Sequence, residues 1–388
     1  MEEGLGTRSL RWWDQSLSKG AAGVAVLHAV LGRPDRAHRW LTRAVCEDVS
    51  IAQGCGLWFG APAVAFAVGS VGGNRYSSAA TRLHDAVTSL VRRRLAAADA
   101  RVRLGACPSR SEFDVVRGLA GLGALLLPSS IGMKAKDDAL LRLVLAHLVR
   151  LTEPIAHVGG NAVPGWWTHD TPSGSATERY AGGHSDLGAA HGITGPLSLL
   201  SLALRSGVEV AGQVEAIHRI CSWMDCWRQE TRAGHWWPQR VTRADVEEGQ
   251  LVLLAGPGRP SWCYGTPGIA RALQLAGIAL GDPARCRGAE DALLRSVIDP
   301  VQLDSHVDTS VCHGWASTVA TVWHAAQDLN SSGLSNALGP LTETLCARAD
   351  ESLGGPIGLV DGVAGVALTL HTIATGEAKG WGRCLLLS

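Results

Sequence analysis

The chain has 388 residues, of which 46% are apolar and 18% charged, and its formal net charge is zero. This composition excludes an extensively disordered chain, and the zero net charge argues against nucleic acid as a partner. The first residues lack the apolar core of a signal peptide, and no run reaches the roughly 20 apolar residues of a membrane span. Ten scattered cysteines suit a reducing cytoplasm, which is the expected location.

A short motif recurs seven times: Gly-x-x-Gly, with Ala or Ser sometimes in the last place, followed by an apolar run. The first glycines of the copies are Gly20, Gly60, Gly118, Gly192, Gly265, Gly314 and Gly362. One such motif carries little information, but seven copies of a unit of this size predict a solenoid or a closed ring of helix pairs. The apolar runs have almost no charge, so we expect seven buried helices whose small residues let neighbours approach closely.

Amphipathic segments lie between the copies. Apolar residues recur at helical spacing in the segments 83–95, 141–148, 214–224 and 338–345. Their charged faces predict an outer layer, to which segment 11–17 would add the last helix. Strand signals are poor, so the predicted class is all-α: an α/α toroid (barrel) of seven Gly-rich inner helices and an outer helical layer.

Two long stretches without helical periodicity interrupt this pattern, at residues 154–186 and 231–260. Long irregular loops in compact domains are often functional. Each stretch contains a tryptophan pair, at 166–167 and 236–237. These pairs either line a cleft for a peptide or pack beneath a loop.

Reactive side chains stand directly before the first glycine in two copies, as Cys263-Tyr264 and Cys312-His313. If the repeats are structurally equivalent, Cys263, Cys312 and His313 meet at the centre of the ring. Two thiolates and one imidazole suit zinc and leave a fourth tetrahedral position for water or substrate. The alternative is that both thiols are buried and inert and His313 is a hydrogen-bonded core histidine. The other cysteines are interpreted as small buried hydrophobes: Cys46, Cys55, Cys107, Cys221, Cys226, Cys286, Cys346 and Cys384.

Three further polar residues are candidates for a site. His191 precedes a repeated glycine and has no neighbouring cysteine, so it is a candidate for proton transfer; otherwise it caps a helix or bonds within the cavity wall. Asp114 is a lone carboxylate in apolar sequence, which either partners such a histidine or caps its own helix. Arg259 would hold a developing negative charge, or is a solvated surface residue.

These motifs resemble those of the lanthipeptide cyclases, which belong to the lanthionine synthetase C-like family. The resemblance extends over all seven repeats and rests on Gly188-Ala-Ala-His191-Gly192, Trp262-Cys263-Tyr264-Gly265, Cys312-His313-Gly314, and Asp114 before Gly118-Leu-Ala-Gly121. It implies an α/α toroid that holds one zinc ion through Cys263, Cys312 and His313. It also implies Michael-type addition of peptide cysteine thiols to dehydroalanine or dehydrobutyrine, which closes lanthionine or methyllanthionine rings. His191 would transfer the proton with Asp114 orienting it, and Arg259 and Tyr264 would lie near the enolate.

The resemblance further implies a stand-alone bacterial enzyme formed by one domain over residues 1–388. It would act on a dehydrated, ribosomally made precursor peptide with its leader, after a separate dehydratase. A complex with a membrane exporter would bring the cytoplasmic enzyme to the membrane periphery. The small inserted domain of bacterial members would fall within 128–187. Copies two and six end in Ala63 and Ser317 where glycine is commoner, which should affect packing more than chemistry.

Other functions fit parts of the pattern. A relative that adds glutathione to dehydrated proteins would keep the zinc and the thiol addition. A non-catalytic toroid would serve as a scaffold or binding module, but the complete set of candidate residues argues against lost activity. Among other α/α toroids, a glycosidase needs a pair of carboxylates in the cavity. A zinc prenyltransferase usually has an oxygen ligand and an aromatic-lined pocket.

Overall fold

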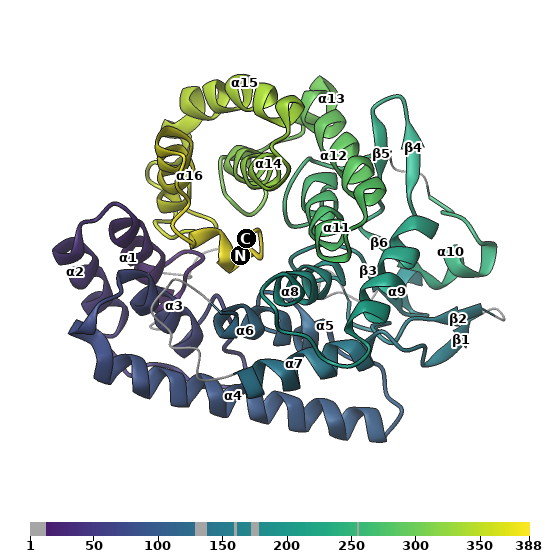
Figure 1. Ribbon diagram of the computed structural model, residues 1–388, viewed down its shortest axis with the longest axis horizontal. Helices are drawn as coiled ribbons and strands as arrows, with labels where there is room; N and C mark the ends of the chain where they lie inside the picture. Colours follow the sequence, from purple (N-terminus) through teal and green to yellow (C-terminus); the bar gives the residue numbers. More distant parts are fainter. Residues whose placement is uncertain (1–12, 129–137, 159–160, 172–177, 254–255) are drawn as a thin grey trace, which may run out of the picture.

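The computed structural model describes residues 13–128, 138–158, 161–171, 178–253 and 256–388. Within these ranges, an apolar helix begins within two residues of the first glycine of each copy. These inner helices are α1 (Ala21–Val30), α3 (Ala61–Val71), α6 (Leu119–Leu126), α8 (Thr194–Arg205), α11 (Thr266–Leu280), α14 (Trp315–Leu329) and α16 (Val363–Thr375). Each contacts the next, and α16 contacts α1, so the seven helices close a ring (Figure 1).

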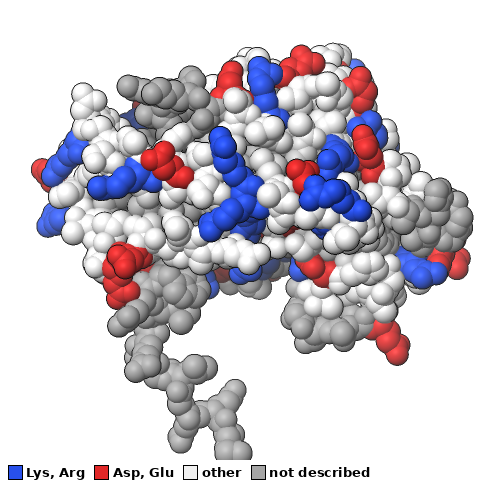
Figure 2. Space-filling view, turned by 90° about the horizontal axis from the view of Figure 1, so that it is seen from below, with Lys and Arg blue, Asp and Glu red and all other residues white. Residues whose placement is uncertain are grey.

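A second layer of helices surrounds this ring. In the described ranges it consists of α2 (Pro34–Ala44), α4 (Ser77–Arg103), α7 (Asp138–Leu151), α9 (Gln213–Cys226), α12 (Pro283–Ile298) and α15 (Ser332–Arg348). Every residue of α6 is buried, whereas α4 buries one apolar face. Figure 2 shows Lys and Arg side chains interspersed with Asp and Glu on the face along which α4 runs. The predicted all-α toroid with an apolar inner ring and a charged outer layer is confirmed.

The segment predicted as a seventh outer helix has a different structure. Of residues 11–17, the structure describes 13–17, which contain one 3-10 turn, η1 (Trp13–Gln15), followed by the buried Leu17. The Leu17 N–H donates to the Trp58 carbonyl at 3.0 Å, and the Leu17 carbonyl accepts from Leu359 at 2.7 Å. These backbone partners place the segment in the wall of the ring, and the helix prediction is wrong because side-chain periodicity cannot reveal them.

Short antiparallel ribbons form in the stretches without helical periodicity. β1 (Ala156–Val158) pairs with β2 (Asn161–Val163), β3 (His184–Asp186) with β6 (Arg240–Thr242), and β4 (Gln229–Thr231) with β5 (Gly234–Trp236). Strands of three residues are too short to show alternation, so the sequence gives no signal for them. The tryptophans at 166–167 and 236–237 are buried, so packing beneath a loop is the correct alternative. The remaining short helices are α5 (Arg110–Phe113), α10 (Arg243–Glu248) and α13 (Pro300–Leu303), with 3-10 turns η2 (Asn74–Tyr76), η3 (Glu178–Tyr180) and η4 (Ala349–Ser352).

The last residues of the chain lie inside the ring, where η5 (Trp381–Leu385) enters it (Figure 1). Trp58 donates from its indole nitrogen to the Cys384 carbonyl at 2.9 Å, and Trp262 donates likewise to the Leu385 carbonyl at 3.0 Å. The two indole rings are 5.8 Å apart, so they pack on each other as well. The ring therefore has a packed interior beneath the turns that start its helices.

The burial of the cysteines differs in part from the prediction. Among the eight cysteines interpreted as small buried hydrophobes, Cys46, Cys226 and Cys346 are exposed and Cys107 is partly buried, so the interpretation is wrong for these four. The exposed three lie at or near the ends of outer helices, where no inner helix covers them. No helix of the described ranges has both the length and the hydropathy needed to cross a membrane.

Candidate functional site

Backbone hydrogen bonds join the turns that precede neighbouring inner helices. The Val115 N–H donates to the Ala190 carbonyl at 3.1 Å, and Ala190 donates to Cys263 at 3.3 Å. Cys263 donates to Cys312 at 3.2 Å, and Cys312 donates to Val360 at 3.0 Å. These bonds hold five successive turns at one level of the ring. Equivalent positions in the repeats therefore face the same space, as the register of the glycine motifs predicts.

The turns before α11 and α14 fit closely because of one glycine and one serine. Gly268 lies in the first turn of α11, and a Cβ there would lie 1.8 Å from the Trp262 carbonyl oxygen, so this position must be glycine. The Ser317 hydroxyl accepts from the Trp262 N–H at 2.6 Å and donates to the Cys312 carbonyl at 3.3 Å. The departure from glycine at position 317 thus supplies a hydrogen-bonded link between the two cysteine-bearing turns, beyond its effect on packing.

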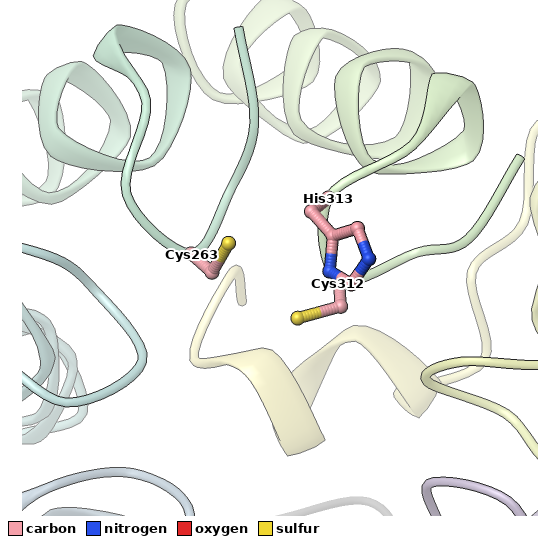
Figure 3. Close-up of side chains that lie close together, drawn as sticks. All are labelled: Cys263, Cys312 and His313. Atoms are coloured by element: carbon pink, nitrogen blue, oxygen red, sulfur yellow. The ribbon is translucent and has the colours of Figure 1, made fainter. Parts of the chain in front are cut away.

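Cys263, Cys312 and His313 come together at these turns (Figure 3). The Sγ atoms of the two cysteines and one ring nitrogen of His313 all lie within 4.8 Å of one another. The second ring nitrogen of His313, Nε2, lies 2.9 Å from Asp308 Oδ2 and points away from the sulfurs. A histidine ligand commonly donates its other N–H to a carboxylate, which fixes the ring for metal binding. Two sulfur donors and an oriented imidazole fit zinc by donor type.

Asp308 is a residue that the sequence analysis missed. It lies five residues before His313, in a loop whose path the sequence does not reveal. Burial opposes ionisation of Asp308, but hydrogen bonds from His313 and Ser310 outweigh it and hold its pKa below the usual value. The only sequence signal was a carboxylate close to a candidate metal-ligating histidine. A search for such partners would have found it.

The two thiols of the cluster differ in their protonation. The Cys312 thiol and then the His313 ring stabilise the Cys263 thiolate, and this holds the Cys263 pKa well below its usual value despite burial. Proximity to the Cys263 sulfur, together with burial, raises the Cys312 pKa. Asp308 and the Cys263 sulfur raise the pKa of His313 to about 10. Metal binding would therefore release protons from this cluster.

His191 and Asp114 form a second polar unit next to these turns. His191 Nδ1 lies 2.7 Å from Asp114 Oδ2, and a carboxylate can only accept, so Nδ1 carries the proton in this contact. Asp114 Oδ1 also accepts from the backbone N–H groups of Arg117 and Gly118, each at 2.7 Å. Asp114 therefore bonds the histidine, and its other oxygen holds the turn that leads into α6 instead of capping the first N–H groups of that helix. The His191 side chain is 38% exposed, which leaves Nε2 open to a ligand.

Tyr264 belongs to a buried network centred on Asp186. Its hydroxyl donates to Asp186 Oδ2 at 3.0 Å, and Arg240 Nε and Arg110 Nη1 lie 3.2 Å and 3.5 Å from the same oxygen. Burial, and then the Asp186 charge, raise the pKa of Tyr264, so it stays a neutral donor. The Tyr264 ring is 6.4 Å from the His191 ring. The tyrosine thus stands beside His191 with its hydroxyl directed to Asp186.

Arg259 lies on the side of the site that holds His313. Its charge helps burial to lower the pKa of His306 to about 4, and the His306 ring contacts the His313 carbonyl at 3.3 Å. The Arg259 Nε atom is buried without a hydrogen-bond partner among the described residues. The structure therefore places Arg259 near the cluster and does not support the alternative of a freely solvated surface arginine.

A cavity of about 520 Å³ opens beside this site. Residues that directly precede repeated glycines contribute to its lining, namely Lys19, Phe59, Arg117, His191 and Asp361. Asp114 and Trp58 also line it. The cavity thus brings a proton-transfer candidate, both signs of charge and aromatic surface into one space large enough for several residues of a peptide.

A ring of seven inner helices, with a Cys-Cys-His cluster and an Asp-His pair at their starts, defines an α/α toroid with a candidate metal centre. The chain belongs to the lanthionine synthetase C-like protein family, whose family model matches residues 11–386. The resemblance seen in the motifs is confirmed.

Known proteins are similar to the chain in sequence and in structure. It is 25% identical over 210 residues to the nisin biosynthesis protein NisC from Lactococcus lactis subsp. lactis. The alignment covers 54% of this chain and 48% of NisC, so the chain spans about half the length of this curated relative. The solved structure of a nisin cyclase matches with a TM-score of 0.82 at 20% sequence identity, over 97% of this chain and 93% of that chain. At this level of identity, the structural match shows the fold.

Proposed function

We propose that this chain is a zinc-dependent lanthionine synthetase. It would add cysteine thiols of a substrate peptide to dehydroalanine or dehydrobutyrine residues of the same peptide. The observation that carries the proposal is the Cys263, Cys312 and His313 cluster beside a cavity that contains His191. Membership of the lanthionine synthetase C-like family supports it. The names of the two similar proteins, a nisin biosynthesis protein and a nisin cyclase, point to the same chemistry.

Cys263, Cys312 and His313 would hold one zinc ion, with Asp308 orienting the histidine. Zinc lowers the pKa of thiols that bind it, which supplies a thiolate nucleophile at neutral pH. We propose that a peptide reaches the cluster from the side of the cavity that His191 lines.

The addition itself needs a proton transfer and charge stabilisation. The thiolate sulfur bonds to the β-carbon, and the electron pair of the carbon–carbon double bond moves through the α-carbon to the carbonyl oxygen, which gives an enolate. A proton then adds to the α-carbon, so that sulfur and hydrogen have added across the double bond. His191, oriented by Asp114 through Nδ1, would take up at Nε2 the proton that the thiol loses and would deliver it to the α-carbon. Arg259 and Tyr264 are proposed to lie near the enolate.

The substrate would be a dehydrated precursor peptide with its leader, made by a separate dehydratase. We place the enzyme in the cytoplasm, with a membrane exporter as a further partner of a biosynthetic complex. We also propose one cyclase domain over residues 1–388, with a small insertion within 128–187.

Ring closure does not change peptide mass, so the test counts free thiols. The purified protein, loaded with zinc, is incubated with a peptide that contains dehydroalanine and cysteine, and the remaining thiols are then alkylated and counted by mass spectrometry. The proposal expects alkylation to disappear with time, and His191→Ala to retain zinc while losing ring closure. Unchanged thiol counts with wild-type protein would contradict it. Consumption of added glutathione in place of the peptide thiol would contradict the choice of nucleophile.

A further inference from the structure

An enolate that forms next to His191 needs a hydrogen-bond donor for its oxygen. The residues proposed for this task from sequence are Arg259 and Tyr264. The Tyr264 hydroxyl is already bonded to Asp186, and neither residue is among the described residues that line the cavity containing His191. A donor on the cavity wall itself would be better placed.

Arg117 has this position. It follows Asp114 on the turn before α6, and its backbone N–H donates to Asp114 Oδ1 while His191 holds Oδ2. One buried carboxylate, 2% exposed, thus fixes the backbone of Arg117 and the ring of His191 relative to each other. The two turns are also bonded directly, from the Val115 N–H to the Ala190 carbonyl at 3.1 Å.

The guanidinium of Arg117 differs from the other cations on the cavity wall. This guanidinium makes no hydrogen bond or ion pair with another described residue, and the bond from Arg117 to Asp114 comes from its backbone N–H. Arg110 also lines the cavity, but its guanidinium forms ion pairs with Asp170 at 3.9 Å and Asp186 at 3.5 Å. Lys19 lies over the Trp13 ring at 5.2 Å, on a turn whose backbone bonds run toward Trp58 and Leu359. Arg117 is therefore the cavity cation that is both uncommitted and fixed to the turn of His191.

We infer that Arg117 is a further catalytic residue, which donates to the carbonyl oxygen of the dehydrated residue and stabilises the enolate that His191 then protonates. This inference rests on the proposed function. The arginine gains most in the transition state, because the carbonyl oxygen becomes fully charged only as the carbon–sulfur bond forms. Its planar fork offers two N–H groups to one oxygen or to an oxygen and a neighbouring carbonyl.

The test compares Arg117→Gln and Arg117→Lys with Arg103→Gln, which removes an exposed arginine at the end of α4, on the outer layer. Zinc content, the dissociation constant of the dehydrated peptide and kcat for ring closure are measured for each. We expect Arg117→Gln to keep its zinc and its peptide affinity within about threefold, and to lose roughly 10²–10³ in kcat, as for loss of one oxyanion donor. Arg117→Lys should recover part of that loss, and Arg103→Gln should match wild type.

Solvent exchange gives an independent readout. The α-proton of the thioether product exchanges for deuterium through the same enolate, so Arg117→Gln should slow this exchange by a similar factor. A kcat and an exchange rate within twofold of wild type, or a loss confined to peptide affinity, would overturn the inference and leave the proposed function standing. Absence of ring closure by zinc-loaded wild type would overturn both.

Discussion

Asp114 offers the sharpest perturbation because two substitutions separate its two tasks. One oxygen accepts from the N–H groups of Arg117 and Gly118, and the other bonds His191. Asp114→Asn keeps a carbonyl oxygen for the two backbone donors but presents an amide to the histidine, and therefore favours the wrong tautomer. Asp114→Ala removes the acceptor for all three groups and leaves the buried Gly118 N–H and the partly buried Arg117 N–H without this partner.

The magnitudes follow from these contacts. An unsatisfied buried donor costs about 1–3 kcal/mol and a partly buried one costs less, so Asp114→Ala should lose about 2–4 kcal/mol of unfolding free energy. Asp114→Asn loses only the charge-assisted part of its bonds and should cost about 1–2 kcal/mol. Both variants misorient the proton-transfer histidine, and loss of such a carboxylate lowers rates by up to roughly 10⁴-fold. The two variants should thus differ in stability and agree in activity.

Urea denaturation gives the two stabilities, and alkylation of the remaining peptide thiols gives the rate of ring closure. Zinc content serves as the control, since the cluster at Cys263, Cys312 and His313 does not include Asp114. Wild-type ring closure by Asp114→Asn would refute the orienting role. Equal stability of the Asn and Ala variants would refute the role of Asp114 in holding the turn before α6.

Three other changes test separate parts of the structure. Asp308→Asn should lower zinc affinity roughly 10- to 100-fold in a chelator competition, because the metal-facing imidazole loses its orienting carboxylate; unchanged affinity would argue against that role. Gly268→Ala should strongly destabilise the protein because its Cβ would lie 1.8 Å from the Trp262 carbonyl oxygen. Gly288 lies in α12 with open space around it, so Gly288→Ala should raise the free energy of unfolding by about 0.5–1 kcal/mol. The opposite order in urea denaturation would contradict the packing described. His324 is buried, which lowers its pKa to about 3, so its contribution to stability is complete above about pH 6.5 and is lost as the pH falls toward 3. His324→Phe should therefore lose less stability between pH 7 and pH 4.5 than wild type, and an equal loss would rule this out.

The repeats made most of the fold predictable. Seven glycine motifs followed by apolar runs identify the inner helices, because a helix without a polar face must be buried on all sides. The apolar run that follows Gly314, for example, forms α14 (Trp315–Leu329). The register of the motifs also brings Cys263, Cys312 and His313 together, because equivalent turns lie at one level of the ring.

Other features depend on contacts that periodicity does not encode. The segment 13–17 reads as helical but bonds to Trp58 and Leu359 through its backbone. Ribbons of three residues give no alternation, and η5 enters the ring through carbonyl groups that any residue would offer. Asp308 lies on a loop, and its approach to His313 depends on the path of that loop.

The central claim is that Cys263, Cys312 and His313 form a metal centre for thiol addition. Zinc content of the purified wild type, Cys312→Ala and Cys346→Ala tests it most directly, since Cys346 is an exposed cysteine of α15 and controls for loss of a thiol. We expect about one zinc per chain in wild type and in Cys346→Ala, and little in Cys312→Ala. Equal zinc in all three proteins, or little zinc in folded wild type after incubation with the metal, would contradict it.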